Sequence, residues 1–325
     1  MPSYSNNSFL NNSFSNATYS SADFTNANHL NDQAAGLRRL MVSPQPRVLS
    51  IISAAKTQPA RLMSNLAASL CCDGSDVLIV QNSPFPSSVK LKAPLIDFIH
   101  KPIDVTQMTM QMDEGYYVAA LLRHQQESAL DFERGSLLDA LFRKLAMQYQ
   151  FVLVETKLNL QQQLPIKTLN LGQIVIHLTS RAEDIKQAYQ LIKQISTQHI
   201  HANIESQPFG ILVTDTTDEK AKIVFRNIAQ VAKRYLKLEL ELIGVVPADD
   251  ALAKAAKLGC SVINAFPLAN ASAAFKTIAK HLDYRIDDQN KSTYLPRQAL
   301  DGTSDHARSY NNRLLSGSGI FEGAM

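Results

Sequence analysis

Between Arg47 and residue 283, short apolar runs alternate with longer stretches of helical periodicity, and this alternation restricts the possible folds most strongly. The apolar runs do not alternate with polar residues, so both faces of each strand are expected to be buried. Strands are predicted at 48–52, 77–80, 117–122, 151–154, 174–178, 210–213 and 242–246. Helices are predicted at 60–72, 137–149, 185–195 and 224–235. The pattern predicts an α/β fold, a mostly parallel sheet with helices on both faces.

Composition and charge restrict the function. Lys plus Arg number 32 against 29 Asp plus Glu, which argues against nucleic acid as the principal partner. No apolar stretch approaches the length of a membrane span, and the first residues do not resemble a secretory leader. The three cysteines, Cys71, Cys72 and Cys260, are interpreted as small core residues in a reducing compartment. We therefore expect a cytoplasmic protein.

The chain is predicted to have four parts. Residues 1–30 are rich in Asn and Ser and contain a single formal charge, which favours disorder. Residues 31–41 form a short helix, residues 47–283 form the α/β domain, and residues 284–325 form a polar tail. Gly317 and Gly319 interrupt the apolar end of that tail, which favours a frayed end over a helix on a membrane surface. Within the domain, Ser180 and Glu183 have the spacing of a capping box and predict the start of a helix.

The short helix has the sequence DQAAGLRRLM. Leu37, Leu40 and Met41 lie on one helical face, and the acidic start and basic end suit the helix dipole. Pro44 and Pro46 then separate it from the domain. Two interpretations remain open, a helix that binds a partner, which is favoured, and a helix that covers its own domain.

The first strand-to-helix turn is where a parallel sheet of this kind would bind phosphate. It reads SAAKTQPA from Ser53 to Ala60, contains no glycine, and has Pro59 in place of an amide donor. Lys56 in this turn is interpreted as a solvated surface charge. The sequence therefore predicts a poor phosphate site.

Acidic residues that could hold a magnesium ion are also missing from the next strand end, where Gln81 and Ser83 stand. Glu155 ends the strand predicted at 151–154. A solvated acid is favoured there over a catalytic or metal-binding one. We thus expect no catalytic residue, no metal and no bound cofactor, with Lys56 and Glu155 as remnants of a nucleotide site.

Several motifs resemble the MinD/ParA family of phosphate-loop ATPases and, within it, the FlhG (FleN) subfamily that regulates flagellum number. DQAAGLRRL resembles the DQA-x-GLR helix of that subfamily. Other matches are the family's NLA, its A-Y-x-L-I-K helix and its G-x-I-P-x-D strand end, which correspond to Asn65 to Ala67, Ala188 to Lys193 and Gly244 to Asp249. Against the family's K-G-G-V-G-K-T, residues 54–60 retain no position. The family's D-x-D falls on Gln81 and Ser83, its next acid on Glu155, and its Asn near Thr214.

The resemblance implies a regulator that stimulates an FlhF-type GTPase through its N-terminal helix. The residues implied in this contact are Asp32, Gln33, Gly36, Leu37, Arg38 and Leu40. Flagellar switch or basal-body proteins and transcriptional regulators are further candidate partners, and the location implied is the cytoplasm, at the cell pole or peripheral to the inner membrane. ATP and magnesium, the cofactors of the family, are not expected here. The alternatives are an atypical ATPase that uses Lys56 and Glu155, or a protein that positions another polar machine, such as cellulose synthesis or cargo partitioning.

Overall fold

The computed structural model describes residues 45–56, 59–81, 93–100, 105–123, 132–159, 161–204 and 209–288. The predicted helix at 31–41 and the predicted tails, apart from residues 284–288, lie outside these ranges. Among the described residues, no helix is both long and apolar enough to cross a bilayer.

The described strands form one eight-stranded sheet in the order β3-β4-β2-β5-β1-β6-β7-β8. Their bounds are β1 (Arg47–Ser53), β2 (Val77–Gln81), β3 (Met110–Gln111), β4 (Tyr117–Ala120), β5 (Phe151–Glu155), β6 (Gln173–Thr179), β7 (Phe209–Thr214) and β8 (Leu240–Val246). Every pair is parallel except β3 with β4. The seven predicted strands and the parallel sheet are confirmed, whereas the two-residue strand β3 was not predicted.

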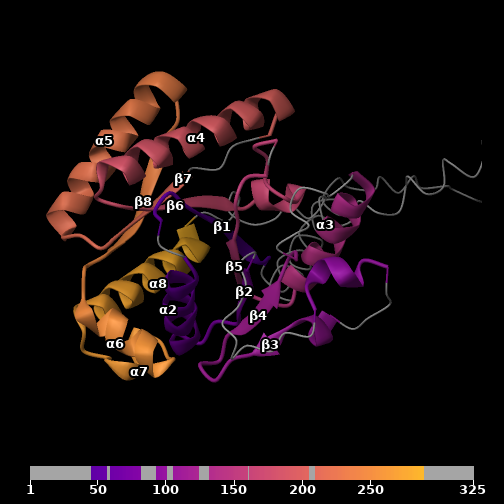
Figure 1. The fold of residues 1–325 in the computed structure, drawn as a ribbon, viewed down its shortest axis with the longest axis horizontal. Coiled ribbons are helices and arrows are strands. Elements are labelled where there is room, and N and C mark those ends of the chain that lie inside the picture. Colours follow the sequence, from indigo (N-terminus) through magenta and orange to yellow (C-terminus); the bar gives the residue numbers. More distant parts are fainter. Residues whose placement is uncertain are drawn as a thin grey trace, which may run out of the picture. The chain divides into compact units, whose positions relative to one another are not determined.

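Helices cover both faces of the sheet (Figure 1). They are α2 (Ala60–Cys72), α3 (Phe132–Ala146), α4 (Ala182–Ala202), α5 (Asp218–Leu236), α6 (Asp250–Leu258), α7 (Val262–Ala265) and α8 (Asn270–Asp288). Short 3-10 turns lie at Leu95–Phe98, Val105–Met108 and Lys167–Asn170. The helix predicted at 60–72 matches α2, while α3, α4 and α5 begin earlier than their apolar periodicity indicated.

Two apolar cores result, one on each side of the sheet. Side chains of β1 alternate between them, since Val48 and Ile52 belong to one core and Leu49 and Ile51 to the other. The first core includes Phe142 of α3, Ile192 of α4 and Ile228 of α5. The second includes Leu66 of α2 and Phe275 of α8. Burial on both faces explains why the strands read as continuous apolar runs.

A polar network joins the start of β1 to the end of α8. Arg47 is 2% exposed, and its guanidinium donates to the main-chain oxygen of Leu282 and, over 3.4 Å, to Oε1 of Gln173. Gln173 Nε2 donates to Glu241 Oε2 at 3.0 Å, and His281 Nε2 lies 3.1 Å from Glu241 Oε1. The buried guanidinium thereby has hydrogen-bond partners, one of them a main-chain oxygen of α8.

Two local predictions were wrong. Arg181 is the N-cap residue of α4 and makes no side-chain capping bond, so Ser180 does not open a capping box. Instead, the Thr179 hydroxyl donates to the Asp184 carboxylate, and the Arg181 amide donates to Thr179 Oγ1 at 3.3 Å. The prediction that the cysteines are core residues fails for Cys72, which is exposed, and for half-buried Cys260, whereas half-buried Cys71 packs against the second core.

Candidate functional site

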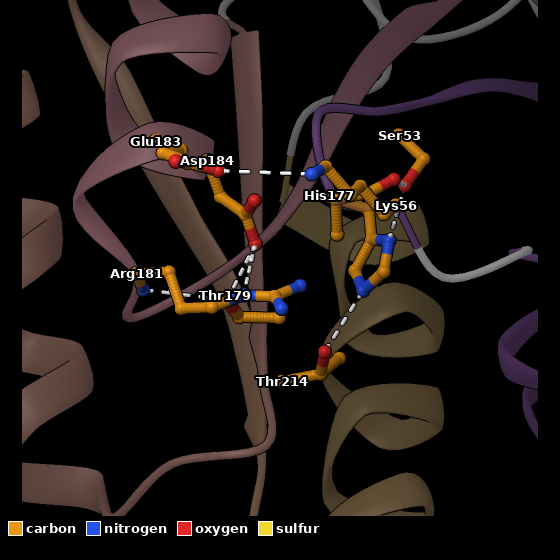
Figure 2. Close-up of polar contacts among 9 residues, drawn as sticks. Ser53, Lys56, His177, Thr179, Arg181, Glu183, Asp184 and Thr214 are labelled. Carbon is orange, nitrogen blue, oxygen red and sulfur yellow. Dashed lines mark hydrogen bonds and ion pairs between the residues drawn. The ribbon is translucent and has the colours of Figure 1, made fainter.

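The carboxyl ends of β1, β6 and β7 meet at the turn that leads into α2. His177 of β6 lies between Ser53 of β1 and Thr214 of β7 (Figure 2). Its Nδ1 is 2.9 Å from Ser53 Oγ, and its Nε2 is 2.8 Å from Thr214 Oγ1. Ser53 Oγ donates to the oxygen of Ala55 at 3.0 Å, so we assign the proton between Ser53 and His177 to Nδ1. A neutral imidazole then accepts from Thr214 and bridges three strands.

Burial lowers the pKa of His177 to about 4, and the nearby Asp184 carboxylate opposes this shift only in part. The imidazole is therefore neutral at pH 7. It adds no positive charge to the turn and cannot serve as a cationic ligand for phosphate.

The lowered pKa of His177 predicts that acid destabilises the fold. Its pKa is 6.5 in the unfolded chain and about 4 in the folded one, so the unfolded state binds more protons between these values. The free energy of unfolding should fall by roughly 3 kcal/mol as the pH drops from 7 to 4, at about 1.4 kcal/mol per pKa unit. Urea unfolding at pH 7 and pH 4 measures this. His177→Gln should flatten the dependence, whereas His201→Gln, at an exposed histidine of α4, should leave it unchanged.

Lys56 is solvent-exposed, as predicted. Its side chain is 84% exposed, and Nζ lies 3.9 Å from Glu183 Oε2 at the start of α4 (Figure 2). Such an exposed pair contributes little to stability.

Glu155 differs from the favoured prediction, because it is 2% exposed and is not a solvated acid. It ends β5 in register with Ile51 of β1, and the amide of Thr156 donates to the oxygen of Ile51 at 3.0 Å. The central position of β5 in the sheet explains its burial. The position of Glu155 at the end of an apolar run did not show that neighbouring elements bury its side chain.

A cleft of about 720 Å³ lies at this edge of the sheet, beside α2. His177, Thr214 and Gln81 line it together with the first residues of α2 and with α6 and α8. Sequence reasoning identified Gln81 and the region of Thr214, but missed His177. His177 could have been identified from the sequence, because it is the one ionisable residue within the apolar run QIVIHLT.

These residues fit a nucleoside triphosphate poorly. A phosphate cradle needs several main-chain amides at a helix start, and here Pro59, which has no amide proton, is the N-cap residue of α2. Lys56 faces Glu183, and His177 is neutral. Among the described residues, no group of three or more His, Cys, Asp and Glu side chains could hold a metal ion.

Comparison with solved structures defines the class of fold. The MinD cell division protein of Aquifex aeolicus matches with a TM-score of 0.54 and 16% identity, over 77% of this chain and 100% of that chain. A ParA family ATPase from Chlorobium tepidum TLS matches with 0.53 and 18%, over 72% and 99%. A cobyrinic acid a,c-diamide synthase from Mycobacterium smegmatis, with bound ATP analog and magnesium, matches with 0.55 and 16%, over 77% and 100%. The chain thus has the α/β fold of MinD/ParA-type phosphate-loop NTPases.

Sequence comparison adds a particular relative. No family model matches the chain. The antiactivator FleN of Pseudomonas aeruginosa is 27% identical over 117 residues, which are 34% of this chain and 38% of FleN. The match thus spans little more than a third of that relative. The predicted resemblance to FlhG/FleN-like proteins of the MinD/ParA type is confirmed.

Proposed function

We propose that this chain is a FlhG-like regulator of flagellum number or placement that acts by binding a partner and has lost ATP hydrolysis. The loss of ATP hydrolysis is supported by the bridge from Ser53 through His177 to Thr214. This bridge is uncharged, and it lies beside the turn where a phosphate would need hydrogen-bond donors and positive charge. FleN, a relative by sequence, is an antiactivator, which supports the regulatory part.

The partner is proposed to be an FlhF-type GTPase, contacted by the helix at residues 31–41. That helix lies outside the described residues, so its support is the sequence DQAAGLRRL alone. Leu37 and Leu40 would dock the apolar face, Arg38 would pair with acids or phosphate, and Gln33 would reach the reaction site. Asp32 would start the helix, and Gly36 would permit a close approach of the partner.

ATP is expected to bind more weakly than millimolar and to leave the melting temperature unchanged. Calorimetric titration with ATP and magnesium measures the first, and thermal unfolding with 5 mM ATP, roughly the order of cellular concentration, measures the second. A ligand present at a hundred times its dissociation constant stabilises the folded state by about 2.7 kcal/mol, which would raise the melting temperature visibly. A micromolar dissociation constant would contradict the loss of ATP binding and favour an ATPase that uses Lys56 and Glu155.

A further inference from the structure

The cleft beside α2 has the size and walls of a small-molecule site. Its volume of about 720 Å³ lies within the range of roughly 300–1,000 Å³ typical of such sites. Leu62 of α2, Tyr116, Val246 of β8 and Phe275 of α8 contribute apolar walls. Burial raises the pKa of Tyr116, so this phenol is uncharged at pH 7. A ligand with an apolar or aromatic body suits these walls.

One polar atom of a residue that lines this cleft has no hydrogen-bond partner among the described residues. Gln81, the last residue of β2, lines the cleft and is 4% exposed. Its main-chain oxygen accepts from the amide of Leu121 at 3.0 Å. Its side-chain oxygen Oε1, however, is buried without a hydrogen-bond partner in the described structure. Buried acceptors are nearly always paired, because an unpaired one is costly, so Oε1 calls for a hydrogen-bond donor.

The charges around the cleft are mainly negative. Three carboxylates, those of Glu114, Asp215 and Asp249, line it against one guanidinium, that of Arg61. The main-chain amides of Ala271 and Ala251, in that order of effect, lower the pKa of Asp249, so this group is ionised at pH 7.

Glu114 is fixed by two donors from the region of α7. Its Oε1 accepts from the amide of Ser261 at 2.6 Å and from Nδ2 of Asn264 at 2.9 Å. The carboxylates that line the cleft outnumber its one guanidinium, so these side chains favour a cation over a phosphate.

From these three observations we propose that the cleft binds a small organic cation whose nitrogen groups donate hydrogen bonds and whose body is apolar or aromatic. The cation would face Glu114, Asp215 and Asp249, one donor would satisfy Oε1 of Gln81, and the body would lie against Tyr116 and Phe275. This ligand class differs from nucleoside phosphates in the sign of its charge. The inference does not depend on the partner of the N-terminal helix.

Three probes of the same shape test the sign and the donors. Benzamidine is a cation with N–H donors, benzamide is neutral, and benzoate is an anion. Titration of the full chain, followed by NMR chemical shifts or calorimetry, should give a dissociation constant at least tenfold lower for benzamidine than for benzamide, with no binding of benzoate. Equal affinities, or a preference for benzoate, would overturn the proposal.

Two substitutions locate the site. Gln81→Leu should weaken benzamidine binding at least fivefold and raise the melting temperature of the ligand-free protein, because it removes the unpaired acceptor. The control Gln190→Leu, on the exposed face of α4, should change neither. A Gln81→Leu protein that melts lower and binds benzamidine unchanged would show a structural role for the amide and refute the proposal.

Asp215→Asn tests the role of charge independently, at a residue outside the apolar core. Asp215 is exposed and has a φ of 58°, a left-handed conformation that Asn also adopts readily. The substitution should weaken benzamidine binding at least threefold and leave benzamide binding unchanged. An equal loss for both probes, or no loss for benzamidine, would contradict the role of charge.

Discussion

The full chain should accelerate GTP hydrolysis by an FlhF-type GTPase, and Gln33→Ala should reduce that acceleration at least tenfold. In such a site the nucleophile is a water that must be held in line with the γ-phosphate, and a polar side chain from a partner can hold it. A tenfold loss corresponds to about 1.4 kcal/mol of transition-state stabilisation. Single-turnover hydrolysis at saturating concentration of the chain measures it. Asn31→Ala, a substitution two residues before Gln33, is the matched control.

Leu37→Asp separates docking from chemistry in the same assay. An ionised carboxylate on the docking face would have to be desolvated, so affinity for the GTPase should fall while the rate at saturation is retained. Leu10→Asp, in the Asn- and Ser-rich segment, should leave affinity unchanged. If the native chain leaves the GTPase rate unaltered, or if Gln33→Ala stimulates equally well, the activator role is wrong.

Gly172→Ala should be among the most destabilising single substitutions of the α/β domain. A Cβ at this position would lie 2.5 Å from the main-chain oxygen of Val48 and 3.0 Å from its Cβ. Main-chain atoms of the central strand β1 cannot yield cheaply, so we expect a loss of about 3 kcal/mol in the free energy of unfolding. The melting temperature should fall by roughly 6–12 °C for a domain of this size.

Gly135→Ala provides the control of opposite sign. Gly135 lies in α3, and a Cβ there would meet no atom within 4 Å. Because alanine loses less conformational entropy in a helix than glycine, the substitution should stabilise the domain by about 0.5–1 kcal/mol. Urea unfolding of both variants at pH 7 makes the comparison. A Gly172→Ala protein as stable as the native one would show that β1 and β6 can move apart.

Gly172 also explains how the site is positioned. Gly172 directly precedes β6 and approaches Val48 of β1 closely, and farther along the same two strands His177 is in register with Ser53. The two residues are 124 positions apart, and no local pattern encodes their contact. The sequence predicted the strands that carry them, because apolar runs are a local signal of burial on both faces, but did not predict the bridge between them.

The same distinction explains the other differences. The missing glycines of the β1–α2 turn and the uncharged Gln81 could be read directly, since they concern residue type at a known place in a βαβ unit. The burial of Glu155 depends on what packs over it, which the sequence around it does not contain. The start of α4 was misassigned because Arg181 is its N-cap residue and the Asp184 carboxylate accepts from the Thr179 hydroxyl, contacts that the spacing of Ser180 and Glu183 does not contain. Strand β3 has only two residues, too few to show a period.

The contact between Arg47 and Leu282 has an evolutionary consequence. The chain enters β1 and approaches the end of α8 at the amino edge of the sheet, whereas the cleft and His177 lie at the carboxyl edge. Both points of attachment are therefore on the side of the domain away from its pocket. A mutation in a segment joined at either end therefore need not alter the pocket, so the pocket does not restrict the sequence of such a segment.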